Sequence, residues 1–268
     1  MTELIDIGAN LTHDSFIDDF DAVLSRARHQ DVVQMVVTGA SLDGSRQALE
    51  LAQAYPGFLF ATAGIHPHHA EETTDAVLEE IRKLAARPEV RAIGETGLDF
   101  FRNFSPRDKQ IESFEAHLEI AADTHMPMFL HERDASKTFA EVLAPWRSKL
   151  EKVVVHCFTG DEDALHTYLD LDCHIGLTGW VCDERRGTHL VPMIRYIPAE
   201  RLMIESDAPY LMPRTIQPKP GTRRNEPQYL PWVCRFIADA LGEPYEAVAE
   251  RTTANARQFF DLPEAHAA

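Results

Sequence analysis

The sequence predicts an α/β protein folded as a (β/α)8 TIM barrel, and two observations carry this prediction. Eight short runs rich in Val, Ile, Leu and Phe are spread along the chain, which is typical of strands buried on both faces of a parallel sheet. Between successive runs lie segments whose apolar residues recur near the 3.6-residue helical period. Eight strand–helix units in one chain indicate a closed parallel barrel.

Each predicted strand is short and apolar, and most end in a polar residue or a glycine. They run from Leu4 to Ala9, Val32 to Thr38, Phe58 to Gly64, Val90 to Glu95, Pro127 to His131, Lys152 to Cys157, Cys173 to Thr178, and Leu202 to Asp207. The predicted helices cover the stretch from Phe16 to Ala27 behind a cap at Asp14, then Ser45 to Tyr55, Asp75 to Ala86, Lys109 to Thr124, Ser136 to Leu143, Glu162 to Leu169, Leu190 to Tyr196, and Pro231 to Leu241. A last helix, about Tyr245 to Phe259, follows Pro244.

The length favours one domain over residues 1–268, the cysteine content and N-terminus favour the cytoplasm, and we expect the protein to work as a monomer. The 268 residues fall within the range of a single barrel, and no stretch is apolar enough to span a bilayer or to act as a signal peptide. The four cysteines are too few and too widely spaced for a disulfide framework, and Cys157 is expected to be a small core residue rather than a nucleophile.

A net charge of −17 argues against broad binding of nucleic acid over the surface, because a polyanion is repelled by it. One loop is an exception. Between Pro209 and Pro227, Arg214, Lys219, Arg223 and Arg224 form a basic stretch, and in a barrel this loop would follow the eighth strand on the catalytic face. It is a candidate phosphate contact, with a solvated surface loop as the alternative.

Four predicted strands close on residues that bind metals: Glu95, His131, His156 and Asp207. Residues at the carboxyl ends of parallel barrel strands meet at one rim, so these side chains are expected to converge. Two imidazoles and two carboxylates suit a divalent cation with positions left for water and substrate. Taken singly, each histidine could instead be a buried structural residue that donates a hydrogen bond to a backbone carbonyl. Two imidazoles and two carboxylates together, however, are costly to bury without partners or a metal.

Further titratable residues lie beside the predicted ligands. His66, just after the third strand, suits a phosphate hydrogen bond or a proton transfer, whereas His68 and His69 are expected at the surface. Glu205 precedes Asp207 by two residues and so can share its side of the strand. It is a candidate for a catalytic role, a second ion or a structural ion pair.

Six motifs in chain order resemble those of the TatD-type metal-dependent deoxyribonucleases over nearly the whole sequence. They are Gly64 to His68, Gly94 to Asp99, Leu130-His131, His156 to Gly160, Glu205 to Leu211, and Arg224 to Pro227. The resemblance implies a TIM barrel of the metal-dependent hydrolase type, with Glu95, His131, His156 and Asp207 as ligands and His66 as the active-site histidine. It further implies Mg²⁺-dependent 3'–5' exonuclease action on single-stranded DNA and RNA, linked to DNA repair or nucleic-acid turnover.

The sequence departs from many relatives at the first strand, where a His-x-His pair is replaced by Gly8 and Asn10. Glycine has no side-chain ligand and asparagine offers a neutral oxygen, so a second cation held from this strand is expected to be weak or absent. The resulting hypothesis places one ion on Glu95, His131 and His156, with Asp207 as ligand or base.

Phosphate contacts in this hypothesis come from Arg223, Arg224 and Arg102. Residue types alone leave the metal open, since imidazole also suits Mn²⁺ or Zn²⁺, and the resemblance favours Mg²⁺. The alternative function is a barrel amidohydrolase acting on a small ester, lactone or amide, for which the basic loop has no use. A non-catalytic metal or nucleic-acid binding protein is a third possibility.

Overall fold

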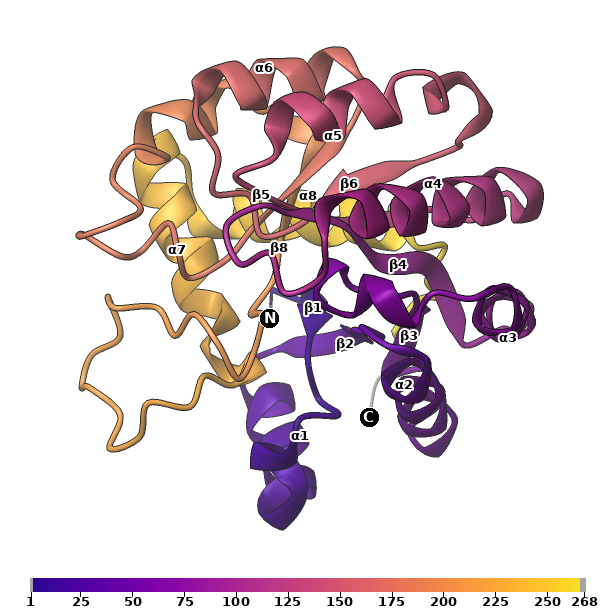
Figure 1. The fold of residues 1–268 in the computed structure, drawn as a ribbon. Helices are drawn as coiled ribbons and strands as arrows, with labels where there is room; N and C mark the ends of the chain where they lie inside the picture. The colour runs from indigo at the N-terminus through magenta and orange to yellow at the C-terminus, as the bar shows by residue number, and fades with distance from the viewer. Residues whose placement is uncertain (1, 266–268) are drawn as a thin grey trace. The chain divides into compact units, whose positions relative to one another are not determined.

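A computed structural model describes residues 2–265 of the chain. Strands and helices alternate along it, as the colour gradient in Figure 1 shows, and the eight strands follow one another in chain order in one sheet. The pairings β3–β4, β4–β5, β5–β6 and β7–β8 are all parallel. This is the (β/α)8 order of elements, and the predicted fold class is confirmed.

The strands are β1 (Leu4–Ala9), β2 (Val32–Val37), β3 (Leu59–Ala63), β4 (Val90–Asp99), β5 (Met128–Arg133), β6 (Val153–Val155), β7 (His174–Leu177) and β8 (Leu202–Ile204). The α-helices are α1 (Phe20–His29), α2 (Leu42–Ala54), α3 (Asp75–Ala85), α4 (Arg107–Thr124), α5 (Ser136–Leu143), α6 (Glu162–Asp170), α7 (Leu230–Leu241) and α8 (Tyr245–Phe259). Within residues 2–265, no helix combines the length and the apolar character needed to cross a membrane.

Two predicted helices differ from the observed ones. The stretch predicted from Phe16 begins as a 3-10 helix, Asp14–Asp19, whose cap is His13 rather than Asp14, because the His13 ring accepts the Ser15 N–H. The helix predicted at Leu190 to Tyr196 is a 3-10 helix, Val191–Tyr196. It stops before Pro198, because a residue that precedes proline is pushed out of the helical region of backbone space.

The chain forms two compact units, which we name by their place in the sequence. The central unit comprises residues 37–156 and 162–174, and so contains β3 to β6 and α2 to α6. The terminal unit comprises the described residues of 1–36, 157–161 and 175–268, with β1, β8, α1, α7 and α8. The prediction of one domain over residues 1–268 stays a prediction.

In the core of the central unit, one buried aromatic side chain from each of α4, α5 and α6 packs against the next. Phe114 stacks on Phe139 with ring centroids 5.1 Å apart, and Phe139 meets Tyr168 edge-on at 5.4 Å. The Tyr168 hydroxyl donates to Glu132, which also accepts the Ala135 N–H at the start of α5. Burial raises the pKa of Glu132, and these two donors satisfy the carboxyl group where it would otherwise be costly to bury.

Strand β4 is longer than predicted, because two glycines let it continue past Glu95 to Asp99. Gly94 and Gly97 have φ of +134° and +135°, and a Cβ on either would lie 2.0 Å from a carbonyl oxygen of the neighbouring β5. The pairing of β4 with β5 shifts register between Ile93 and Thr96. Such an irregularity re-aims side chains, and here it falls at Glu95.

His117 joins α4 to the segment after β3. Its Nδ1 lies 2.7 Å from the Ser113 carbonyl, and its Nε2 accepts the Ile65 N–H at 3.1 Å. The ring therefore carries its proton on Nδ1 and is neutral. Burial lowers the pKa of His117 from 6.5 to about 4.

We predict that His117 makes the protein less stable in mild acid. Between pH 6.5 and about 4 the unfolded chain binds a proton that the folded chain refuses, so stability is complete above pH 6.5 and falls as the pH drops toward 4. The full loss is roughly 3 kcal/mol. Urea unfolding of wild type and His117→Gln across this range measures it. A wild-type profile parallel to that of the variant would contradict the prediction.

Candidate metal centre

Three imidazole rings in the central unit converge on one carboxylate oxygen. Oε1 of Glu95 on β4 lies 3.3 Å from Nε2 of His66, 3.2 Å from Nδ1 of His131 and 2.8 Å from Nε2 of His156. His131 lies on β5, His156 is the first residue after β6, and His66 follows β3 after Gly64 and Ile65. Four neighbouring strands thus each supply one side chain. Three of the four predicted ligands, Glu95, His131 and His156, are brought together.

Asp99, at the end of β4, forms a second layer behind these rings. Its Oδ2 lies 2.8 Å from Nε2 of His68 and 3.5 Å from Nε2 of His131. Its Oδ1 accepts the backbone N–H groups of Phe101 and Arg102. A carboxylate behind a metal-binding histidine fixes the orientation of the ring and raises its basicity.

Charge and burial act against each other in this cluster. Burial alone would raise the pKa of Glu95, but the adjacent imidazoles hold it well below its ordinary value, so the carboxylate is ionised. Burial likewise opposes ionisation of Asp99, yet the adjacent imidazoles of His131 and His68 keep its pKa low. Burial would also lower the pKa of His131, and the two carboxylates raise it instead.

The hydrogen bonds assign different roles to His66 and His131. Nδ1 of His66 accepts the His68 N–H at 3.0 Å, so a neutral ring carries its proton on Nε2, the atom that faces Glu95. Burial lowers the pKa of His66 to about 4, which keeps the ring neutral. His66 is therefore a donor toward the site. His131 can keep its proton on Nε2 toward Asp99 and offer the Nδ1 lone pair.

The donor set fits a divalent cation. Ligand atoms of His66, Glu95 and His131 all lie within 4.8 Å of one another, and Nε2 of His156 lies against the same Glu95 oxygen. His131 Nε2 is buried and makes no hydrogen bond of good geometry within residues 2–265. Because the His66 proton occupies the nitrogen that faces Glu95, His131 and His156 remain the candidate imidazole ligands. Nitrogen and carboxylate oxygen together suit Mn²⁺, Zn²⁺ or Mg²⁺.

The terminal unit holds the remaining predicted acids. Oδ1 of Asp207 accepts the side-chain amide of Asn10 at 2.9 Å, and the Asp207 N–H donates to the Gly8 carbonyl. Asn10 thus orients a carboxylate, which the sequence analysis did not foresee. Glu205 is fully buried and accepts the Cys157 N–H. The roles proposed for Asp207 and Glu205 stay predictions.

The predicted phosphate ligands differ in what they contact. Arg224 donates to Asp19 and Glu226, and Arg26 binds the same two carboxylates. The two guanidinium groups hold the pKa of Asp19 well below its usual range. Arg224 is thereby engaged within the protein, and it ties the segment after β8 to the start of α1.

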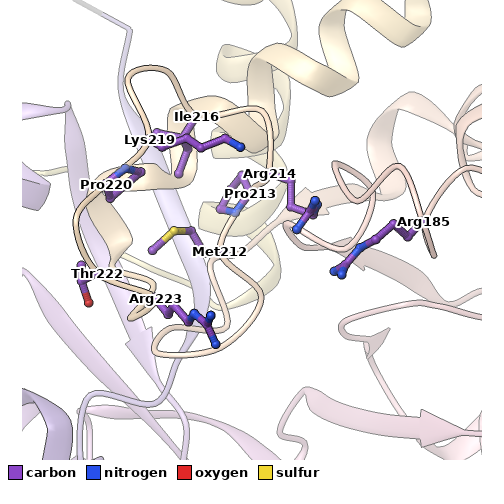
Figure 2. Close-up of a pocket in the computed structure, with 9 residues that line it drawn as sticks. All are labelled: Arg185, Met212, Pro213, Arg214, Ile216, Lys219, Pro220, Thr222 and Arg223. Atoms are coloured by element: carbon purple, nitrogen blue, oxygen red, sulfur yellow. The ribbon is translucent and has the colours of Figure 1, made fainter.

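Arg223, by contrast, lines a basic pocket of about 520 Å³ in the terminal unit (Figure 2). Arg185 and Arg214 line it as well, and both pair with acids, Arg185 with Asp183 and Arg214 with Glu184. Within residues 2–265, neither Arg223 nor Lys219 forms an ion pair. We call the pocket lined by Arg185, Arg214, Lys219 and Arg223 the basic pocket. Arg102 lies elsewhere, exposed in the loop between β4 and α4.

A family model described as TatD related DNase matches residues 5–261. The chain belongs to the TatD-related DNase family. It is 50% identical to a 3'-5' ssDNA/RNA exonuclease TatD of Musicola paradisiaca, over 97% of this chain and 98% of that protein. A protein of the same name from Pantoea vagans is 48% identical, over 97% and 100% of the two chains.

Solved structures agree with the family assignment. A TatD family hydrolase from Entamoeba histolytica superposes with a TM-score of 0.89 at 25% identity, covering 98% of this chain and 100% of the other. A TatD homolog from Escherichia coli K12 also gives 0.89, at 26% identity and with 98% and 99% coverage. A lactonase from Listeria monocytogenes gives 0.65 at 15% identity, with 98% and 96% coverage, and so shares the fold alone.

Sequence reasoning missed Asp99 and misplaced His68. Asp99 lies in one of the six motifs, but the predicted strand ends at Glu95, so the sequence does not place the Asp99 side chain beside the histidines. His68 was expected at the surface, yet it is half-buried and bonded to Asp99, while His69 is exposed as predicted. The alternation of a strand that continued to Asp99 was the signal that could have found it, because Glu95, Gly97 and Asp99 share one face.

We predict that Asp99→Asn weakens the binding of Mn²⁺, used as the probe, by about 10- to 100-fold, because His131 loses its orienting charge. Glu95→Gln removes a ligand and weakens binding further. Calorimetric titration of chelator-treated protein measures both affinities. Glu72→Gln, at an exposed glutamate, is the control and keeps the wild-type value. Equal affinities in all four proteins would disprove the assignment of the centre.

Proposed function

We propose that this chain is a metal-dependent exonuclease that removes nucleotides from the 3' end of single-stranded DNA and RNA. The observation that carries the proposal is the convergence of three imidazoles on Glu95 in a member of the TatD-related DNase family. Relatives at 48–50% identity bear the name of a 3'-5' ssDNA/RNA exonuclease over nearly their full length. The reaction is hydrolysis of a phosphodiester.

In this proposal Glu95, His131 and His156 hold one divalent cation, with Asp207 as a further ligand or as the base. When bound, the cation makes water more acidic and offsets charge that develops on the phosphate. Asn10 fixes the direction of the Asp207 carboxylate. His66 presents a proton on Nε2, with which it can donate a hydrogen bond to a phosphate oxygen or to the leaving oxygen as negative charge develops there.

Phosphate groups away from the reaction are held, we propose, by Arg223 in the basic pocket, with Lys219 beside it. The pocket is lined by four cationic side chains and by no acidic one. Hydrogen bonds from guanidinium groups to phosphate oxygens are among the strongest in proteins, so they can act locally within an acidic chain. Arg224 would act indirectly, by holding the segment that carries Arg223, and Arg102 would contact phosphate from the β4–α4 loop.

The physiological cation in this proposal is Mg²⁺, which prefers carboxylate and phosphate oxygens. We further propose that the protein works in the cytoplasm, in DNA repair or nucleic-acid turnover, and as a monomer. None of its four cysteines forms a disulfide bond, in keeping with a reducing compartment. Glu205 is kept as a candidate catalytic residue, although its buried contact with the Cys157 N–H is also what a structural carboxylate would make.

A ladder assay tests the activity and its direction. With Mg²⁺, a 5'-labelled single strand should shorten progressively, whereas a 3'-labelled strand should release its label at once as a mononucleotide. Glu95→Ala should lower the rate by at least about a hundredfold, since it removes a ligand. Internal fragments, release of 5'-labelled mononucleotide before the strand shortens, or full activity in the presence of chelator would each refute the proposal.

Replacement of Arg223 by Ala separates a nuclease from a small-molecule hydrolase. We expect KM for a single-stranded oligonucleotide to rise about tenfold, because a charged hydrogen bond to phosphate is lost, and the dependence of KM on salt to weaken. Arg195→Ala, at an exposed arginine of the same unit, serves as the control. Arg224→Ala should instead lower the melting temperature, since Asp19 and Glu226 each lose one of their two arginine partners. An unchanged KM in Arg223→Ala would favour an ester, lactone or amide substrate.

A further inference from the structure

The loop between β4 and α4 carries two phenylalanines that face solvent. Phe101 is 51% exposed and Phe104 is 64% exposed, and they are two of only five large apolar side chains that are exposed among residues 2–265. Leaving such rings in water forgoes a sizeable hydrophobic stabilisation. Two of them in one short loop therefore indicate a surface that another molecule covers.

The loop is held in one shape by its own hydrogen bonds. Asp99 accepts the N–H groups of Phe101 and Arg102, and Ser105, which is buried, donates its hydroxyl to the His68 carbonyl. The Gln110 side chain of α4 accepts the Asp99 N–H and donates to the Ser105 carbonyl. Hydrogen bonds thus hold the backbone at both ends of the loop, near Asp99 and near Ser105, and the exposed rings lie between these two points.

Phe104 begins a row of rings that ends in the metal centre. Its ring meets that of His68 at a centroid distance of 4.7 Å, His68 lies 4.2 Å from His66, and His66 lies 4.5 Å from His131. All of these residues belong to the central unit. A flat group stacked on Phe104 would therefore be separated from the candidate ligand His131 by the rings of His68 and His66.

Phe101 carries two cations on its ring. The Arg133 guanidinium lies 4.2 Å from the ring centroid, and that of Arg102 lies 5.4 Å from it. An aromatic face with positive charge beside it matches a nucleotide, in which a flat base is joined to a phosphate. The acidic residue of the loop, Asp99, points its oxygens at backbone N–H groups and histidines instead.

We propose that Phe104 stacks on an unpaired base next to the scissile phosphodiester, and that Phe101, with Arg102 and Arg133, receives a neighbouring nucleotide. The inference rests on the proposed exonuclease function and names how that site selects its substrate. Stacking on an aromatic ring accepts every base, so the platform binds without sequence preference. Bases of a duplex are already stacked on each other, so the same rings favour single strands.

The experiment compares two single-stranded oligonucleotides, one with ordinary bases and one in which abasic nucleotides replace those at the 3' end. On the ordinary strand, Phe104→Ala should raise KM about five- to tenfold, with a smaller change in kcat. Phe104→Trp should keep the wild-type KM. On the abasic strand, wild type and Phe104→Ala should have the same KM, because there is no base left to stack. On the ordinary strand, the ratio of the Phe104→Ala KM to the wild-type KM should not depend on salt.

The matched control is Ile17→Ala, at an apolar side chain of the terminal unit with similar exposure, and it should behave as wild type on both strands. Calorimetric titration with Mn²⁺ checks that Phe104→Ala retains the cation site. A KM within twofold of wild type, or an equal loss on ordinary and abasic strands, would overturn the inference. Failure of wild type to degrade any single strand would instead overturn the proposed function.

Discussion

One buried carboxylate oxygen, Oε1 of Glu95, faces three imidazole nitrogens, and the geometry of the central unit depends on satisfying it. A buried carboxylate is costly unless opposite charge or hydrogen bonds compensate it, and here the compensation comes from the ends of β3, β5 and β6. The register of these strands is therefore tied to the site. Gly94 and Gly97 let β4 approach β5 closely enough for Glu95 to be aimed at the rings.

The rings around Glu95 are not equivalent, because each has a different partner on its far side. His66 receives a backbone N–H, which leaves its proton pointing into the site, whereas His131 faces the carboxylate of Asp99. A cation that displaced protons from this cluster could take the lone pair of His131 but not that of His66. Distance alone groups His66 with the candidate ligands, and only the hydrogen bonds behind the rings separate a candidate ligand from a hydrogen-bond donor.

The strand–helix alternation and the gathering of Glu95, His131 and His156 could be predicted from sequence, since short apolar runs and polar strand ends are local signals. Alternation beyond Glu95 is a signal for Asp99, but the contact of Asp99 with the histidines depends on a register shift that two glycines permit, which no local pattern reveals. Arg223 and Arg224 are neighbours that no local pattern distinguishes. Arg224 is engaged by Asp19, 205 residues away in the sequence, whereas Arg223 lines the basic pocket.

Charge also explains why an acidic chain would use aromatic rings to hold a polyanion. With a net charge of −17, general attraction of nucleic acid is absent, and binding must come from a few local contacts. Cations can supply these only where no acid neutralises them, as at Arg223 and Lys219, since most other arginines described above already bind carboxylates. A stacking contact has no such competitor, because no acidic side chain can satisfy the face of Phe104. Under the proposed function, aromatic rings beside the candidate metal centre would add affinity for nucleic acid without adding a positive charge that nearby acidic side chains would bind.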